Sequence, residues 1–153
     1  MDMKVRIENQ QKKILLHPRQ IRQAVNSIQK HENLSLVDLT VIFVTERKIK
    51  SLNRQFLHRS YPTDVLAFDL TPEGLSYQKT KRPVRRISGE IYISTPEACR
   101  NAAVYQNPVE REIILYVIHG ILHLLGYDDH TQKDQAAMRA KEQQLLKVVT
   151  GKK

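Results

Sequence analysis

The chain has 153 residues, of which 41% are hydrophobic and 27% are charged. This composition is typical of a folded globular protein, and the length predicts one domain spanning residues 1–153. No apolar run approaches the ~20 residues of a membrane-spanning helix, and the first residues lack the apolar centre of a signal peptide. The single cysteine, Cys99, excludes an intramolecular disulfide and a zinc site built from several cysteines. We therefore expect a cytoplasmic protein without membrane contact.

The charge of the chain is strongly positive. It contains 25 Lys and Arg against 16 Asp and Glu, which gives a formal net charge of +9. Small proteins this basic often bind polyanions, and nucleic acid is the most frequent of these. We therefore expect contact with nucleic acid rather than a merely solvated basic surface.

The first half of the chain carries signals for two strands and two helices. Alternating apolar residues predict a half-buried strand at 4–8, and Pro18 opens a run with apolar residues at helical spacing. A continuous β-branched run at 39–44 predicts a buried strand. A short helix that ends near Phe56 is expected to follow it.

The middle of the chain mixes turns and strands. A turn signal at 61–64 leads into a short strand at 65–68, and the polar segment 72–83 is expected to be an exposed loop. A fourth strand is predicted at 87–93. A helix follows, for which Thr95 is the expected N-cap residue.

The last third of the chain predicts further helices. From Val109 onward, apolar residues form a wide helical stripe that ends at Gly126, a helix-stopping residue. A last helix is expected at about 133–148. Four strands with about five helices, in no strict alternation, predict an α+β fold with a small mixed four-stranded sheet and flanking helices.

Three histidines gather in residues 119–130, which read HGILHLLGYDDH. His119 and His123 are four residues apart, so a helix places both rings on one face. Gly126 then allows the chain to leave the helix in a left-handed conformation, so that residue 129 or 130 can reach the same point. Three ligands leave one position open, as in catalytic zinc sites. We predict a metal site at the end of the central helix rather than two satisfied core histidines.

The chemistry of this motif limits the reactions it supports. Zinc suits neutral imidazole ligands best, although nickel, copper or iron could occupy such a site. In metalloproteases a glutamate general base directly follows the first histidine, but here Gly120 stands at that position. Hydrolysis of peptides is therefore disfavoured. A metal can still activate water near neutral pH, and a phosphodiester beside a ribose 2′-hydroxyl needs less proton transfer.

The motif His-Gly-x-Leu-His-Leu-x-Gly-Tyr-Asp resembles the signature of the bacterial YbeY family of ribosomal-RNA maturation endoribonucleases. Leu52-Asn53 with residues 61–68, YPTDVLAF, resembles the family's Leu-Asn…Pro-Thr-Asp-Val-Leu-Ser-Phe segment. Residues 89–94, GEIYIS, resemble its Gly-Asp-Ile strand. The resemblance extends from about residue 40 to residue 130.

The resemblance implies a mixed sheet with flanking helices and one zinc ion per chain held by three histidines. It implies a cytoplasmic, single-strand-specific endoribonuclease that matures the 3′ end of 16S rRNA and acts in ribosome quality control. His119 and His123 would then be both metal ligands and catalytic residues. The expected partners are ribosomal RNA and the small ribosomal subunit, and without a heptad pattern we expect a monomer.

Two positions depart from the family pattern. The family's third histidine falls where this chain has Asp129, and His130 comes one residue later. We favour His130 as the third ligand, with Asp129 as the alternative. The family also has an arginine where this chain has Leu57. Arg59, two residues later, is the candidate to supply that catalytic charge, and the alternative is that this chain lacks the contact and cuts more weakly.

Basic residues outside the motif are expected to bind RNA phosphates without reading the base sequence. Two other functions remain open. One is a metallohydrolase of another class, which Gly120 disfavours. The other is a ribosome-associated binding or assembly factor with a structural metal, for which ligand substitutions would cost more stability than activity. The candidate RNA-binding residues are Arg54, Arg59, Lys79, Lys81, Arg82, Arg85 and Arg86.

Overall fold

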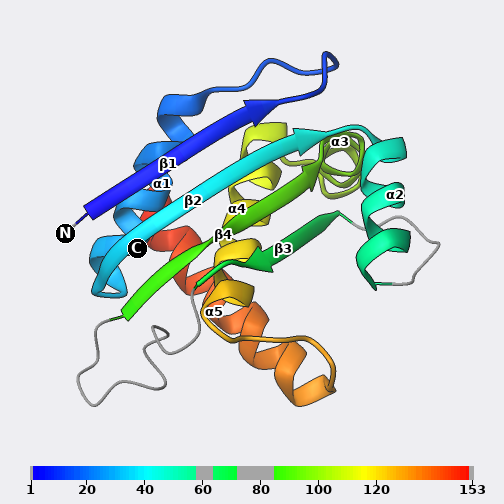
Figure 1. Cartoon of the computed structure of the whole chain (residues 1–153). Coiled ribbons are helices and arrows are strands. Elements are labelled where there is room, and N and C mark those ends of the chain that lie inside the picture. Colours follow the sequence, from blue (N-terminus) through cyan, green and yellow to red (C-terminus); the bar gives the residue numbers. More distant parts are fainter. Residues whose placement is uncertain (1, 58–63, 72–84, 152–153) are drawn as a thin grey trace.

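The computed structural model describes residues 2–57, 64–71 and 85–151, which form four strands and five helices (Figure 1). The predicted α+β fold is confirmed. The strands are β1 (Asp2–Asn9), β2 (Leu34–Val44), β3 (Val65–Asp69) and β4 (Arg85–Ser94). The helices are α1 (Pro18–His31), α2 (Glu46–Leu57), α3 (Thr95–Tyr105), α4 (Val109–Leu124) and α5 (Gln132–Thr150).

The sheet is mixed, as the sequence predicts. Its strand order is β1-β2-β4-β3, in which β1, β2 and β4 are parallel and β3 is antiparallel to β4. β2 begins at Leu34, five residues before the predicted start at 39. The added residues pair with β1 on one side and β4 on the other, so neighbouring strands extend β2 beyond its apolar run.

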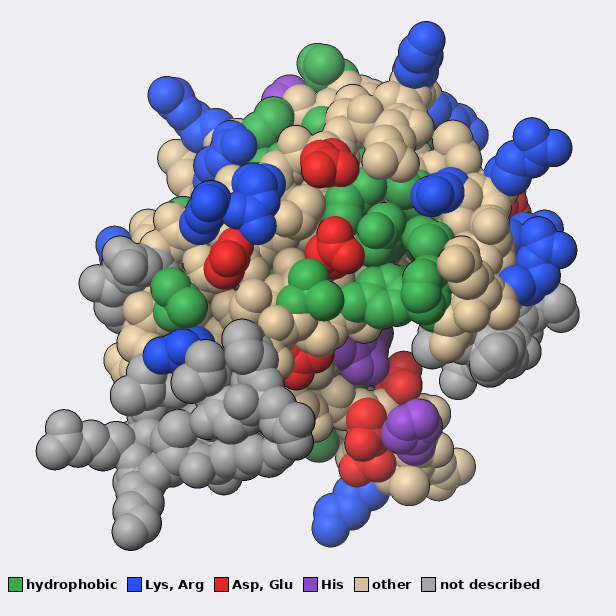
Figure 2. Space-filling model, in the orientation of Figure 1, with side chains coloured by type: hydrophobic (Ala, Val, Ile, Leu, Met, Phe, Trp, Pro, Cys, Tyr) green, Lys and Arg blue, Asp and Glu red, His purple; other side chains and the backbone are tan. Residues whose placement is uncertain are grey.

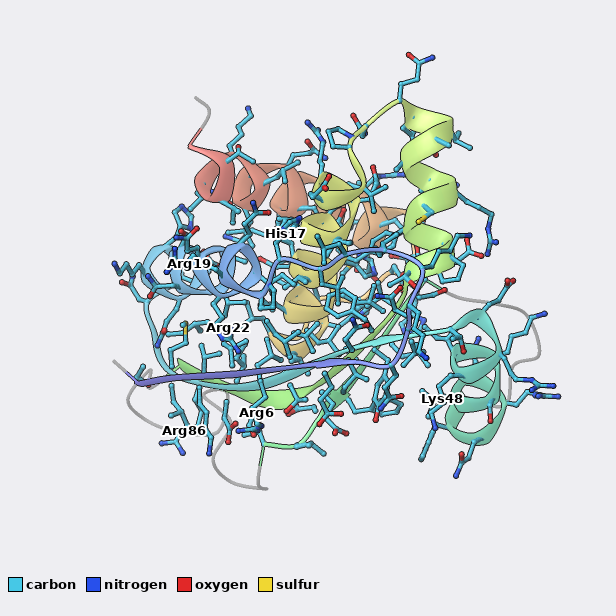
Figure 3. All side chains as sticks on the ribbon, turned by 90° about the horizontal axis from the view of Figure 1, so that it is seen from above. Arg6, His17, Arg19, Arg22, Lys48 and Arg86 are labelled. Atoms are coloured by element: carbon cyan, nitrogen blue, oxygen red, sulfur yellow. The ribbon has the colours of Figure 1, made fainter. Side chains whose placement is uncertain are left out.

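The helices cover the two faces of the sheet unequally. Figure 3 shows α1, α4 and α5 on one side of the sheet, where they enclose the larger core. α2 lies at one end and covers part of the other face. The smaller core beneath α2 contains Ile42, Val44, Ile49, Leu52 and Leu66.

A glycine allows α4 to lie close to the centre of the sheet. A Cβ atom on Gly120 would lie 2.7 Å from both Cδ1 and Cγ2 of Ile91 on β4, which is closer than real Cβ contacts. The position after His119 therefore has no room for a side chain. Packing of α4 on β4 thus gives a physical reason for the missing glutamate at position 120.

The start of α3 differs from the prediction by one residue. The side chain of Ser94 accepts a hydrogen bond from the backbone N–H of Glu97 at 3.5 Å, so Ser94 is the N-cap residue. Thr95, the predicted cap, is the fully buried first residue of the helix. Its hydroxyl donates to the backbone oxygen of Val44 at 3.5 Å, which ties the start of α3 to the end of β2.

Among the described residues, no helix combines the length and apolar character needed to cross a membrane.

Candidate metal centre

Three side chains meet at the end of α4. His119 and His123 on that helix and Asp129 after it have potential ligand atoms that all lie within 4.8 Å of one another. The Nε2 atoms of the two histidines are 3.1 Å apart. Two nitrogens bound tetrahedrally to one zinc ion at ~2.0–2.1 Å are themselves about 3.3 Å apart. The pair therefore fits two ligands of a single ion.

Hydrogen bonds to the other ring nitrogens orient both histidines. His119 Nδ1 lies 2.6 Å from Oε1 of Glu142, and His123 Nδ1 lies 3.1 Å from the backbone oxygen of Tyr127. Both partners are acceptors, so each Nδ1 carries the proton and donates it. Each Nε2 then presents a lone pair, which is the state that a metal requires.

The turn after α4 places one of these partners. Gly126 has φ 101°, the left-handed conformation that the sequence predicts for it. Its N–H donates to the backbone oxygen of His123 at 3.1 Å, and the N–H of Tyr127 donates to that of Leu122 at 3.0 Å. These two bonds form a Schellman motif. The turn that ends α4 therefore also brings the Tyr127 carbonyl to the ring of His123.

The two histidines have opposite pKa shifts. Burial lowers the pKa of His119, but the hydrogen bond and charge of Glu142, with the charges of Asp64 and Asp129, outweigh burial and raise it. Burial and the neighbouring His119 lower the pKa of His123. The centre thus favours one positive charge, but it disfavours protonation of the second ring. Two imidazoles that face the same cation are expected to behave in this way.

The structure brings Asp129, rather than His130, into the three-residue group. Both side chains are exposed. The N–H of His130 donates to Oδ1 of Asp128 at 3.3 Å, and the backbone oxygen of Asp129 accepts from Nε2 of Gln135 at 3.0 Å. A carboxylate with two imidazoles is an accepted ligand set for zinc and leaves a fourth position open.

Sequence reasoning missed Glu142. It lies four residues after the buried Met138 and three before the buried Leu145, so it shares the apolar face of α5. A carboxylate on such a face is a signal for a buried polar partner. Asp64, the last residue of the turn signal at 61–64, lines the same pocket as His119.

Figure 2 shows histidine and acidic side chains together at the lower edge of one face.

The candidate RNA-binding residues are only partly within the described residues. Arg54 is exposed on α2, and Arg86 on β4 lies on the side of the sheet away from α1, α4 and α5 (Figure 3). The other candidates stay predictions, because the structure does not describe Arg59, Lys79, Lys81, Arg82 or the side chain of Arg85.

These features define an α+β protein with a candidate metal centre of three ligands at the end of its central helix. The family model described as "Endoribonuclease YbeY" matches residues 6–150. The chain therefore belongs to the endoribonuclease YbeY family, a family of RNA-cleaving hydrolases. The family assignment made from the histidine motif is confirmed.

Individual relatives agree with this assignment. The endoribonuclease YbeY of Syntrophus aciditrophicus is 33% identical over 153 residues, which cover 99% of this chain and 92% of the relative. That of Shouchella clausii is 38% identical over 112 residues, covering 71% of this chain and 70% of the relative. The solution structure of TM1509 from Thermotoga maritima superposes with a TM-score of 0.63 at 31% identity, and covers 97% of this chain and 90% of that one.

Proposed function

We propose that this protein is a zinc-dependent endoribonuclease that cleaves single-stranded RNA. The observation that carries the proposal is the pair of Nε2 atoms of His119 and His123, 3.1 Å apart with the carboxylate of Asp129 beside them, in a chain of the endoribonuclease YbeY family. The biological substrate that we propose is the 3′ end of 16S rRNA, with a further role in ribosome quality control. The protein would act in the cytoplasm as a monomer, through one domain spanning residues 1–153.

His119, His123 and Asp129 would hold one zinc ion per chain. When bound, zinc would polarise a phosphate oxygen and lower the pKa of a water molecule at the open position. Asp129 is preferred to His130 because one of its carboxylate oxygens lies within 4.8 Å of a ring nitrogen of both His119 and His123. With an aspartate in place of a third neutral histidine, the loaded centre would carry one positive charge instead of two.

The surrounding residues would orient these ligands and bind the RNA. Glu142 holds the ring of His119, and the carbonyl of Tyr127 holds that of His123. Arg59 would balance charge on the pentacoordinate phosphorus of the transition state. Arg54 and Arg86, with the basic residues predicted from the sequence, would bind phosphates along the strand and the small ribosomal subunit.

The test measures zinc content and cleavage of a single-stranded RNA oligonucleotide and of its duplex. The wild type should hold one zinc per chain and cut only the single strand. His123→Ala should lose both zinc and cleavage. His17→Ala removes an exposed histidine that lies near the first turns of α4, at the other end of the helix from the candidate centre, and should lose neither.

A binding factor with a structural metal predicts another result. The zinc-loaded wild type would then cut RNA no faster than His123→Ala, while His123→Ala would unfold at a lower temperature. That outcome would replace the nuclease proposal.

A further inference from the structure

A pocket of about 330 Å³ opens beside the candidate metal centre. Its walls come from α3, α4, α5 and the start of β3. His119 and Asp129 both line it, so the pocket and the centre share a wall. A molecule that reaches the centre can therefore place a neighbouring group in this pocket.

A tyrosine ring at the pocket is free to receive a flat ligand. Tyr105, the last residue of α3, lines the pocket and is 68% exposed. Within the described part of the chain, no hydrogen bond or ring contact engages its side chain. The side chains of Leu115 and Met138 form an apolar part of the pocket wall. Exposed aromatic rings of this kind are the surfaces on which bases of single-stranded nucleic acids stack.

The polar groups of the pocket are mainly acceptors. The amide nitrogen of Asn101 donates to the hydroxyl of Tyr116, and that hydroxyl donates to the backbone oxygen of Glu97 at 3.5 Å. The amide oxygen of Asn101 is left to accept from a ligand. Glu112, which is 4% exposed, accepts from Nδ2 of Asn107 through only one of its two carboxylate oxygens.

The charge of the pocket selects which part of a nucleotide can enter. Four carboxylates and one guanidinium line the pocket. With the charge of Asp129 assigned to zinc, three carboxylates still face one guanidinium, so a phosphate would be repelled from the pocket. A neutral base would not be repelled, and its N–H groups would find acceptors. The charged residues of the lining are Asp64, Glu112, Asp129, Glu142 and Arg139.

We propose that this pocket binds the nucleobase adjacent to the phosphodiester that is cut, and that it selects bases with an exocyclic amino group. The inference rests on the proposed nuclease function. Adenine, cytosine and guanine each carry an exocyclic amino donor. Uracil carries none, and its single N3–H lies between two carbonyl oxygens that would approach the oxygens of Asn101 and Glu112. The base would stack on Tyr105 with its amino group toward this acceptor wall.

The first test compares cleavage of four RNA heptamers that are oligouridine except at the central position. Cleavage next to a central adenine, cytosine or guanine should be about tenfold or more faster than next to uracil. Tyr105→Ala should reduce the three fast rates toward the uracil rate and leave the zinc content unchanged. Tyr105→Phe retains the ring and should retain the preference. Val104→Ala, at an adjacent site that is 71% exposed, should behave as wild type.

The second test needs neither metal nor catalysis. Titration of the metal-free protein with cytidine should shift the NMR signal of the Asn101 side-chain amide, and uridine should shift it much less. If spermidine shifts this signal and cytidine does not, the pocket binds cations and the inference is wrong.

The two tests separate this inference from the proposed function. Equal cleavage of the four heptamers by both wild type and Tyr105→Ala would overturn the pocket assignment and leave the nuclease intact. Failure of the zinc-loaded wild type to cut any RNA would refute the nuclease. The cytidine titration would then decide only whether the pocket binds a base, and the placement of that base beside a cleaved bond would fall with the nuclease.

Discussion

The Nδ1 atom of His119 lies 2.6 Å from Oε1 of Glu142, a residue 23 positions further along the chain. His119 is on α4 and Glu142 is on α5, and their side chains are only 26% and 12% exposed. The contact joins the candidate metal centre to the last helix. The position of a candidate metal ligand therefore depends on how α5 packs against α4.

Glu142→Gln should weaken zinc binding by about 10–100-fold. The amide oxygen can still accept the proton of His119 Nδ1, but the negative charge that makes the ring a better ligand is lost. Competition with a zinc chelator measures the effect. Glu110→Gln, in the exposed first turn of α4, is the control and should bind zinc as tightly as the wild type. If Glu142→Gln bound zinc as tightly as the wild type, the charge of Glu142 would not contribute to the zinc affinity of His119.

Acidification should release the metal in two stages. Because Glu142, Asp64 and Asp129 outweigh burial and raise the pKa of His119 above 6.5, protons compete for its Nε2 first as the pH falls. Apparent zinc affinity should drop about tenfold per pH unit below that pKa. The fall should steepen below pH 6.5, where His123, with its lowered pKa, begins to titrate. Zinc titrations between about pH 5 and 8 test this, and a flat profile would contradict it.

Gly126→Ala should reduce both stability and zinc affinity. A side chain at φ 101° is strained, and relief of that strain would move the Tyr127 carbonyl that orients His123. We expect a loss of about 1–3 kcal/mol in the free energy of unfolding, with weaker zinc binding. Gly151→Ala is the matched control, since Gly151 has φ 69° at the end of α5 and no neighbouring atom within 4 Å of an added Cβ. It should lose some stability and no zinc affinity.

Gly120→Ala should destabilise the fold by about 1–3 kcal/mol through overpacking, partly offset by about 1 kcal/mol of helix propensity. The cause is the 2.7 Å approach of the new Cβ to Ile91. Denaturant unfolding of a double-mutant cycle measures the coupling. The cost of Gly120→Ala should shrink in an Ile91→Ala background, whereas equal costs in both backgrounds would show that this contact is not responsible.

Local patterns in the sequence were enough to predict the histidine pair and the turn after it. The four-residue spacing of His119 and His123 is a property of any helix, and Gly126 adopts its left-handed conformation within a single turn. The four strands follow in the same way from short apolar runs, although their pairing into a mixed sheet joins residues far apart in sequence. The histidine spacing, the turn and the individual strands depend on neighbours in sequence.

The remaining features of the site depend on residues distant in sequence or on small differences in backbone path. Glu142 reaches His119 only because α5 packs on α4. The alternatives Asp129 and His130 are adjacent in sequence, so the path of the chain after Gly126 decides which side chain turns toward the rings. The early residues of β2 are extended because two strands flank them.

The proposed catalytic metal centre consists of two histidines and Asp129. Its most direct test is the zinc content of Asp129→Ala and His130→Ala, measured together with cleavage of single-stranded RNA. We predict that Asp129→Ala loses both zinc and cleavage and that His130→Ala keeps both. Loss of zinc and cleavage in His130→Ala, with both retained in Asp129→Ala, would show instead that His130 is the third ligand.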